Sequence, residues 1–495
     1  MKKYTLIALI AFLFIAFACN DEEPTTTSLE DELGEITTAD EVNDFIWKGL
    51  NLYYLWQADV PDLADNRFNN LNELFTFFRE SNSPESTFSS LLFQEGTTDR
   101  FSWIVDDYIT LENSFQGINL TTGMEIGLRR YADNPTNVYA YVRYVIPNSS
   151  AATAGLQRGM LINRVNDTQL TDTNFRNLLF GANNSLTIGL GDFNEGNPID
   201  NSTTFDLTKT ELQENPIAVA KVIESGNSKV GYLLYNQFAS SFDQQLNTAF
   251  GMFKAESVKD LIVDLRYNPG GSTRSATRLG SMITGQFPNQ VYAKQVWNEK
   301  VRNAIDEDQF VDNFPTRIVS NNVDEAINSL NLPRVYFIVS GSSASASELV
   351  INALDAYIDV QVVGTKTVGK QVGSITLYDS DNLFRSGDNL NPDHRYAMQP
   401  LVFEIQNKDG INYINGIIPG NAAGANFSGI NLAENPGNLG VLGETSDPLL
   451  QRTLTLITTG AKGNFKSENI NITEEIYDSK LATPAGNNMY TELKN

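Results

Sequence analysis

The stretch VKDLIVDLRYNPGGS, residues 258–272, decides how the second half of this chain folds. Its apolar run is typical of a buried strand, and the proline and two glycines that follow are typical of a tight turn. A helical pattern, SATRLGSMITG, comes directly after the turn at residues 275–285. The stretch therefore predicts a strand, a glycine-rich turn and a helix in immediate succession.

The same alternation continues on both sides of this stretch. Upstream, KVGYLLYNQF (229–238) predicts a strand and SFDQQLNTAFGMFKAES (241–257) predicts an amphipathic helix. Downstream, RVYFIVS (334–340), SASELVINALDAY (345–357) and VQVVGTK (360–366) predict a strand, a helix and a strand. This order favours a mostly parallel sheet covered on both faces, whose site lies beyond the carboxyl ends of the strands. The breaks NPGGS and SGSSASAS are therefore candidates for the same rim.

Residues 112–212 show short strands and turns instead. NVYAYVRYVI is an alternating strand, and PNSSAATAGLQRGMLINRVNDTQL contains two turns, a one-turn helix and a further strand. This stretch resembles a PDZ domain, in which a peptide adds as a strand to a sheet edge and its C-terminal carboxylate is held by backbone N–H groups. The resemblance implies that Gly123, Met124, Glu125 and Ile126 form the peptide-binding loop and strand. A small β-rich domain without peptide binding is the alternative.

The segments before residue 112 divide into a leader, a tether and a helical domain. MKKYTLIALIAFLFIAFAC has two lysines, a short apolar run and small Ala18, which predicts a secretory signal over residues 1–18 and a lipidated Cys19. A plain signal peptide with an incidental cysteine is the alternative. The polar stretch 19–38 predicts a flexible tether. Lipidation would place the protein in the cell envelope as an outer membrane lipoprotein, facing the periplasm or the surface, with the lipid as its membrane anchor.

Residues 39–111 carry apolar positions at helical spacing and predict a small helical domain. The aromatic cluster of Trp47, Tyr53, Tyr54 and Trp56 is most simply the core of that domain, and a peptide-binding aromatic face is the alternative.

Composition excludes several classes of function. The formal net charge of −25 argues against a nucleic-acid partner, because a phosphate backbone is bound by basic surface. Cys19 is the only cysteine, so no internal disulfide is expected. No His, Cys or carboxylate cluster has metal-ligand spacing, and we expect neither a metal nor a cofactor. The only histidine, His394, lies in a proline-flanked loop and is best explained as a structural residue.

A serine can be activated by a lysine where burial away from water lowers the pKa of the amine. The small-residue stretch that follows VQVVGTK offers Lys366 and Lys370 for this role. Lys370 is flanked by Gly369 and Gln371, so it can be held close to backbone.

Three motifs in this order, DLRYNPGGS, SGSSASASELV and GTKTVGKQVGS, resemble peptidase family S41, the C-terminal processing proteases. The resemblance implies a Ser–Lys dyad, with Ser345 as the nucleophile and Lys370 as the base at the family's usual separation. It also implies an oxyanion hole made by the backbone N–H groups of Ala346 and of Gly270 or Gly271. The segments LYYLWQADVPDL and DRFSWIVDDY are similar to those of Bacteroidetes-type members.

One position departs from the family pattern. The family often has a glutamine four residues after the lysine, where this chain has Ser374. Either Ser374 or Gln371 is a candidate to orient Lys370. The departure leaves two alternatives to an active peptidase: a degenerate S41-like lipoprotein that serves as a peptide-binding scaffold, and a Ser–Lys hydrolase of a non-peptide ester.

The expected fold is multidomain α+β, with a mostly parallel, crotonase-like ββα-type sheet in the catalytic domain. The expected function is an envelope serine endopeptidase that acts on polypeptides, with a PDZ-like domain that binds or gates their C-terminal ends. The expected parts are a signal peptide (1–18), a lipidated cysteine and tether (19–38), a helical domain (39–111), a PDZ-like domain (112–212), a Ser–Lys protease domain (213–465) and a C-terminal tail (466–495).

Overall fold

The computed structural model describes residues 35–226, 228–320, 323–420, 422–460, 473–484, 486 and 489–491. The predicted signal peptide, Cys19 and most of the predicted tether lie outside the described residues. The chain forms two compact units, and the multidomain, mixed α/β class expected from the sequence is confirmed. Within the described part of the chain, no helix has the length and apolarity that crossing a membrane requires.

The first unit is mostly helical, as residues 39–111 predicted. Its helices and strands are α2 (Thr38–Tyr53), η2 (Gln57–Asp59), η3 (Pro61–Leu63), α3 (Leu71–Phe78), α4 (Pro84–Ser90), β1 (Trp103–Val105), β21 (Leu377–Tyr378) and β22 (Ala397–Gln399). Helix α2 begins where the Thr37 hydroxyl accepts from the Asp40 N–H and the Asp40 carboxylate accepts in return. Tyr54 is fully buried and donates to Asp99, whereas Trp47, Tyr53 and Trp56 are half-buried.

Residues 375–402 pack within this first unit. Strand β22 pairs antiparallel with β1, with Trp103 opposite Gln399. A side chain at Gly49 of α2 would collide with Met398, so the two segments pack closely. His394 lies in the same unit, with its Nε2 3.0 Å from the Asp379 carboxylate, which fits the structural role predicted for it.

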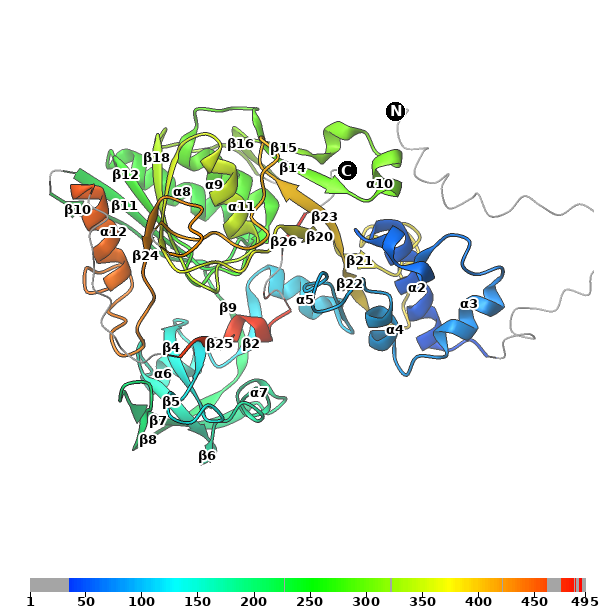
Figure 1. The fold of residues 1–495 in the computed structure, drawn as a ribbon, viewed down its shortest axis with the longest axis horizontal. Helices are drawn as coiled ribbons and strands as arrows, with labels where there is room; N and C mark the ends of the chain where they lie inside the picture. Colours follow the sequence, from blue (N-terminus) through cyan, green and yellow to red (C-terminus); the bar gives the residue numbers. More distant parts are fainter. Residues whose placement is uncertain are drawn as a thin grey trace, which may run out of the picture. The chain divides into compact units, whose positions relative to one another are not determined.

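The second unit contains the predicted β-rich stretch as an antiparallel sheet (Figure 1). Its strands run in the order β25 (Glu475–Asp478), β3 (Met124–Arg130), β4 (Val138–Val145), β5 (Leu161–Val165), β7 (Ser185–Asp192) and β8 (Ile199–Thr208), and β6 (Thr168–Gln169) pairs with β5. Two short helices, α6 (Ser150–Ala154) and α7 (Phe175–Phe180), accompany the sheet. The core of this body is apolar, with Ile126, Leu128 and Ile162 fully buried in it.

The remainder of the second unit contains a mostly parallel sheet. Its order is β10 (Ile217–Ser225), β11 (Ser228–Tyr235), β12 (Asp260–Asp264), β18 (Arg334–Val339), β19 (Asp359–Gly364) and β24 (Gly429–Asn431). Every neighbouring pair is parallel except β10 and β11. Leucines of α12 (Pro448–Thr459) pack with Tyr232 and Ile262 on one face, and Gly231 faces Phe253 of α8 (Asp243–Ala255) on the other.

A second six-stranded sheet lies beside these elements. Its order is β13 (Gly271–Ser272), β26 (Met489–Tyr490), β20 (Val372–Ser374), β23 (Leu401–Gln406), β14 (Val291–Trp297) and β15 (Val311–Asn313). The other elements are α5 (Tyr108–Phe115), β2 (Ile118–Thr121), β9 (Thr210–Gln213), η4 (Ser240–Phe242), α9 (Thr273–Thr284), α10 (Glu299–Ala304), η5 (Glu307–Phe310), β16 (Arg317–Ser320), β17 (Val323–Ala326), α11 (Ala346–Asp355) and η6 (Ser479–Ala482).

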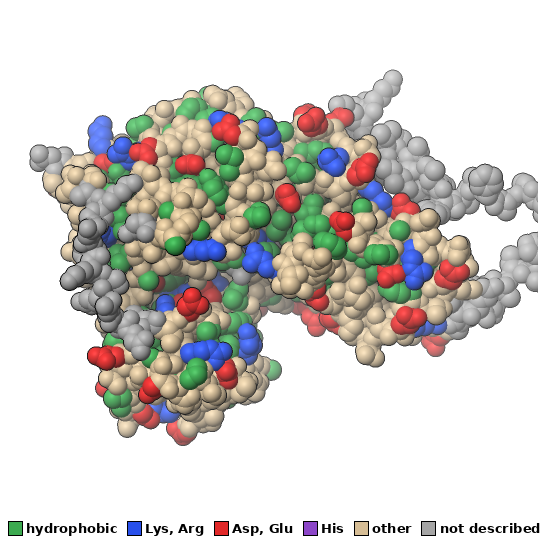
Figure 2. Space-filling view, viewed as in Figure 1, with side chains coloured by type: hydrophobic (Ala, Val, Ile, Leu, Met, Phe, Trp, Pro, Cys, Tyr) green, Lys and Arg blue, Asp and Glu red, His purple; other side chains and the backbone are tan. Residues whose placement is uncertain are grey.

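Described residues of the predicted C-terminal tail contribute two strands to the sheets of the second unit. Strand β25 is an edge strand of the antiparallel sheet, and β26 lies between β13 and β20. These two strands could not be predicted from the sequence, because they are four and two residues long, too short for a periodic pattern. Over the face shown in Figure 2, acidic and basic side chains are scattered rather than gathered in one patch.

Candidate active site

The three motifs meet at the carboxyl ends of β12, β18 and β19. The carbonyl of Asn268, in the NPGG turn, accepts hydrogen bonds from the Ala344 N–H at 3.2 Å and from the Ser347 hydroxyl at 3.0 Å. The carbonyl of Ser343 accepts from the Val368 N–H at 3.1 Å. These bonds join the NPGG turn, the loop before Ser345 (the serine loop) and the loop before Lys370 (the lysine loop). All three lie at the carboxyl ends of the parallel strands, where ligands bind in sheets of this kind.

Ser345 lies at the start of α11 in a strained backbone conformation. Its φ of 65° and ψ of −118° are unfavourable for a residue with a Cβ. Such strain costs on the order of 1–3 kcal/mol and is concentrated at functional sites. The side chain is fully buried, and its Oγ has no hydrogen-bond partner among the described residues. A hydroxyl that makes no structural bond is available for chemistry.

Glu348 brings the backbones of Ser345 and Lys370 together. One oxygen of its carboxylate accepts from the Ser345 N–H and from the Lys370 N–H, both at 2.8 Å. The two nitrogens are therefore no more than 5.6 Å apart. The other oxygen accepts from the Gly369 N–H at 2.7 Å and from the Thr367 hydroxyl. A single buried carboxylate thus fixes the position of the serine loop relative to the lysine loop.

Burial raises the pKa of Glu348 above its ordinary value, and the four hydrogen-bond donors oppose that rise. All four partners donate, so they favour the ionised carboxylate, which only accepts. The motifs and spacings of the sequence did not single out Glu348 for this role. The signal available was its place three residues after Ser345, from which its side chain can return to the start of the helix.

Replacing Glu348 with alanine is expected to lower the free energy of unfolding by about 3 kcal/mol or more, because buried N–H donors lose their acceptor. Urea denaturation measures the change. Glu256→Ala is the control, since Glu256 is exposed and its ion pair with Lys229 lies at the surface, where such pairs contribute little to stability. Equal stabilities for the Glu348→Ala and Glu256→Ala variants would show that the carboxylate does not hold the two loops.

The candidate oxyanion donors lie in the NPGG turn and at the first residue of α11. Gly270 and Gly271 have φ values of 113° and 131°, which glycine adopts readily. A Cβ at Gly271 would lie 2.3 Å from the Phe238 carbonyl oxygen, so only glycine fits there. The Gly270 N–H already donates to the Asn268 side chain at 2.9 Å, whereas Ala346 occupies the helix start predicted for the other donor.

Lys370 is fully buried, in contrast to the exposed Lys366 of the same loop. Of the two candidates to orient Lys370, Ser374 donates its hydroxyl proton to the Met489 carbonyl at 3.0 Å, which leaves only its lone pairs for an amine. The amide of Gln371 is buried and has no hydrogen-bond partner within the described ranges. These observations do not show that Ser374 or Gln371 orients the Lys370 amine, so both residues remain candidates.

The predicted peptide-binding loop leads into β3, the strand next to β25 at one end of the antiparallel sheet. Gly123 has a φ of 83°, and Met124, Glu125 and Ile126 begin β3. The hydroxyl of Ser479 accepts from the Ile126 N–H at 2.9 Å and donates to the Glu125 carboxylate at 2.7 Å. In this structure, therefore, Ser479 from the C-terminal part of the chain occupies hydrogen-bonding groups of the predicted peptide-binding strand.

The Glu125 carboxyl should make stability depend on pH. Burial, the largest cause, raises its pKa from 4.5 to about 7; nearby Glu214 and Asp478 also raise it, and Lys480 opposes them. The folded state therefore binds the proton more tightly, and this contribution to stability is present below about pH 4.5 and lost as pH rises toward 7.

The variant Glu125→Gln is expected to gain up to about 3 kcal/mol relative to the wild type between pH 5 and pH 8. Urea denaturation at the two pH values measures the gain, and Glu211→Gln, at an exposed position on β9, serves as the control. A difference between Glu125→Gln and the wild type that stays constant with pH would contradict the raised pKa.

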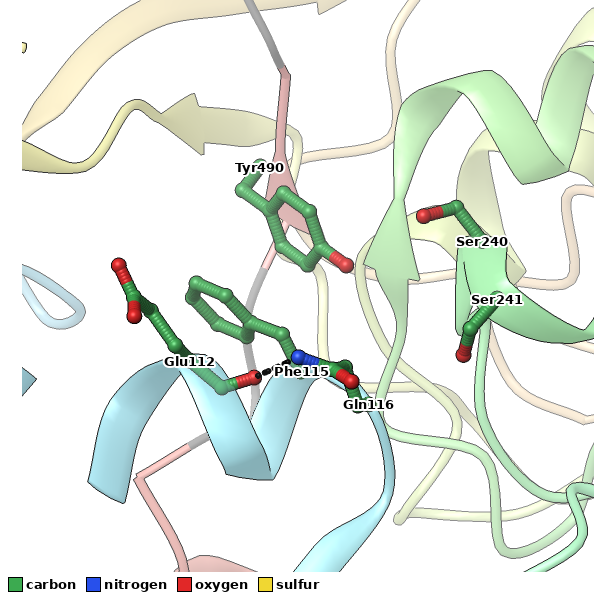
Figure 3. Close-up of a pocket in the computed structure, with 6 residues that line it drawn as sticks. All are labelled: Glu112, Phe115, Gln116, Ser240, Ser241 and Tyr490. Carbon is green, nitrogen blue, oxygen red and sulfur yellow. Dashed lines mark hydrogen bonds between the residues drawn. The ribbon is translucent and has the colours of Figure 1, made fainter. Parts of the chain in front are cut away.

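A cavity of about 310 Å³ lies beside β26 (Figure 3). The rings of Phe115 and Tyr490 stack at its wall with centroids 4.3 Å apart, and Ser240 and Ser241 lie across from them. Tyr490 is opposite both Ser272 and Ser374 in its sheet. Among the described residues, no group of His, Cys, Asp and Glu side chains is arranged to hold a metal ion.

Comparisons with known proteins agree on one family. A family model described as "Peptidase family S41" matches residues 229–386, and one described as "Peptidase S41 N-terminal domain" matches residues 41–103. The chain is 26% identical over 171 residues to a "Probable CtpA-like serine protease" of Staphylococcus epidermidis, which covers 34% of this chain and 31% of the relative. The relative of that name from Staphylococcus aureus strain N315 is 25% identical over 166 residues, with 34% and 30% covered.

The matched region thus spans about a third of the length of these curated relatives. Among solved structures, one described as "Putative S41 protease from Bacteroides fragilis NCTC 9343" is similar, with a TM-score of 0.61 and 23% identity. That match covers 84% of this chain and 97% of the other. This structural likeness establishes a shared fold.

Proposed function

Since the chain carries a peptidase family S41 domain at residues 229–386 and the S41 N-terminal domain at residues 41–103, we propose that it is a serine endopeptidase with a Ser345–Lys370 dyad. The observation that carries this proposal is the carboxylate of Glu348, which bonds the backbones of both dyad residues. A second supporting observation is the strained, unpartnered Ser345 hydroxyl at a helix start.

The proposed reaction begins when the neutral amine of Lys370 takes the Ser345 hydroxyl proton as Oγ attacks a peptide carbonyl carbon. The N–H groups of Ala346 and of Gly270 or Gly271 stabilise the oxyanion. When the tetrahedral intermediate collapses, the C–N bond breaks and the leaving amine receives the proton from Lys370. Lys370 then takes a proton from water as the water oxygen attacks the acyl carbon. When this second intermediate collapses, the bond from the acyl carbon to the Ser345 oxygen breaks and Lys370 returns the proton to that oxygen.

Complete burial of Lys370 supports its part as the base. Removal from water disfavours the ammonium form, and only the neutral amine can accept a proton. The start of α11 supports the other half of the chemistry, because a helix N-terminus favours developing negative charge.

We assign substrate presentation to the PDZ-like body, residues 112–212. Strand β3, which follows Gly123, already pairs antiparallel with an extended segment, β25, and this is the pairing that an added peptide would make. Polypeptide substrates, engaged through their C-terminal ends, are the partners proposed for it. The location proposed with it is the cell envelope, with lipidated Cys19 as an outer-membrane anchor.

Incubation with an unfolded polypeptide and with a simple ester separates this proposal from its alternatives. The proposal expects peptide fragments, identified by mass spectrometry, from the wild type and none from Ser345→Ala. Ester hydrolysis without peptide cleavage would indicate an esterase instead. Peptide binding without any hydrolysis would indicate a peptide-binding scaffold. That alternative arises because this chain has Ser374 where the family often has a glutamine.

A further inference from the structure

The edge of the antiparallel sheet where a peptide would add already holds a strand of this chain. Strand β25 pairs antiparallel with β3, with Glu475 opposite Arg129 and Asp478 opposite Gly127. In the strand order β25 comes first and β3 second, so β25 covers the edge of β3. Pairing of an extended segment with an exposed edge is the geometry by which such domains bind peptides.

The side chains of β25 are held as a bound peptide's would be. The ring of Tyr477 packs against Phe175 and Phe180 of α7, with centroids 5.2 Å and 5.5 Å apart. The guanidinium of Arg176, on the same helix, lies 5.0 Å from the centre of the Tyr477 ring. When a peptide binds as an added strand, its main-chain hydrogen bonds give affinity, and pockets for its side chains give sequence specificity. The contacts of Tyr477 with α7 are of the second kind.

Charge adds a second element of recognition. The guanidinium of Arg143 forms ion pairs with Glu475 and Asp478, on either side of Tyr477. Arg143 is itself almost fully buried. Without acidic partners the charge of Arg143 would be buried and uncompensated, which is energetically costly. We therefore expect a segment that pairs with β3 to bind better when it carries carboxylates that reach Arg143.

From these contacts we propose that residues 475–479 are an intramolecular ligand of the peptide groove, and that an external peptide with an aromatic residue flanked by carboxylates competes with them. The inference deepens the proposed function by naming the chemistry of the peptide the groove accepts. A tethered ligand acts at an effective concentration in the millimolar range, so it occupies the groove unless a competitor binds well. The pairing of β25 with β3 is short and has an irregular register between Glu475 and Tyr477, which suits a displaceable strand.

The groove is connected to the candidate active site. Besides its two carboxylate partners, Arg143 donates to the Ser342 hydroxyl at 2.8 Å, three residues before Ser345. Further along the same segment, β26 pairs with Gly271 and Ser374. Exchange of the intramolecular ligand for a substrate would therefore change contacts of the serine loop itself.

Peptide binding to the full chain tests this inference. A fluorescent peptide TEEIYDSK, the sequence of residues 473–480, is titrated by anisotropy into protein carrying Ser345→Ala, so that no cleavage interferes. The additional change Tyr477→Ala, which weakens the resident strand, is expected to tighten binding at least tenfold. The same peptide with alanine for tyrosine should show no such gain. Tyr413→Ala is the matched control, because the described ring contact of Tyr413 is with Phe427.

A third change, Phe175→Ala, should abolish the gain by removing the helix wall of the groove. Equal affinities with and without Tyr477, or a gain that survives Phe175→Ala, would overturn the inference. Thermal unfolding verifies that each variant is folded. If Tyr477→Ala does not fold, Glu475→Gln replaces it, with an expected gain of about threefold to tenfold through loss of one ion pair. Because binding is read without catalysis, a failed protease proposal and a failed ligand proposal give different results.

Discussion

Replacement of Ser345 by alanine is expected to reduce kcat/KM for peptide cleavage by about 10,000-fold to a millionfold, the range for loss of a serine nucleophile. The change removes the one oxygen that can form the acyl-enzyme. It should not disturb the fold, because the Ser345 Oγ makes no hydrogen bond within the described residues. The measurement is steady-state cleavage of a quenched fluorescent peptide, with unfolding followed in parallel.

Two neighbouring serines provide matched controls. The Ser343 hydroxyl donates to the Leu265 carbonyl at 2.8 Å, and the Ser347 hydroxyl donates to the Asn268 carbonyl. Ser343→Ala loses two structural bonds, since the Ser343 hydroxyl also accepts from the Ser340 N–H, and Ser347→Ala loses one. Each bond is worth about 1 kcal/mol, and both variants keep the nucleophile. A protein that stays fully active without Ser345, or is inactive only without Ser347, would rule out the assigned nucleophile.

Replacement of Lys370 by methionine should lower kcat by about 100-fold to 10,000-fold, the usual contribution of a positioned general base. Methionine nearly preserves the length of the side chain and suits the buried position. KM should change little, since the amine acts on the reacting proton and is not proposed to bind the substrate ground state. The same peptide assay separates kcat from KM.

The control for this variant is Lys366→Met, in the same loop. Lys366 is exposed and lies outside the proposed dyad, so its replacement should leave both constants unchanged. Equal losses in the two variants would show that the loop, rather than the amine of Lys370, is responsible.

Much of the central sheet could be predicted from the sequence, because its strands are continuous apolar runs. The runs at 229–238, 258–268 and 334–340 contain β11, β12 and β18 in parallel pairing. In such sheets the strand ends form one rim, so the sequence could also predict that the NPGG turn and the serine loop meet there.

The sequence could not predict the pairing of segments far apart in the chain. Strands β22 and β25 pair with β1 and β3, and nothing in their own residues identifies these partners. Strand β26 is two residues long and has no periodicity to detect. For this reason the sequence could not predict that residues 375–402 pack with the first unit or that β25 and β26 join the sheets of the second.

The candidate site shows the same division between what sequence can and cannot predict. Ser345 and Lys370 could be selected by motif and spacing, but the residue that joins them could not. Glu348 in the first turn of a helix is ordinarily a favourable charge at the helix start. Only the approach of Thr367, Gly369 and Lys370 to its carboxylate makes it the link between the loops.

The most direct test of the proposed dyad is the modification of Ser345 by an uncharged fluorophosphonate, located by mass spectrometry. We predict a single adduct on Ser345 of the wild type, formed faster as pH rises and the amine loses its proton. In Lys370→Met the same adduct should form at least about 100-fold more slowly. An adduct on another residue, or an unchanged rate without Lys370, would contradict the Ser–Lys mechanism.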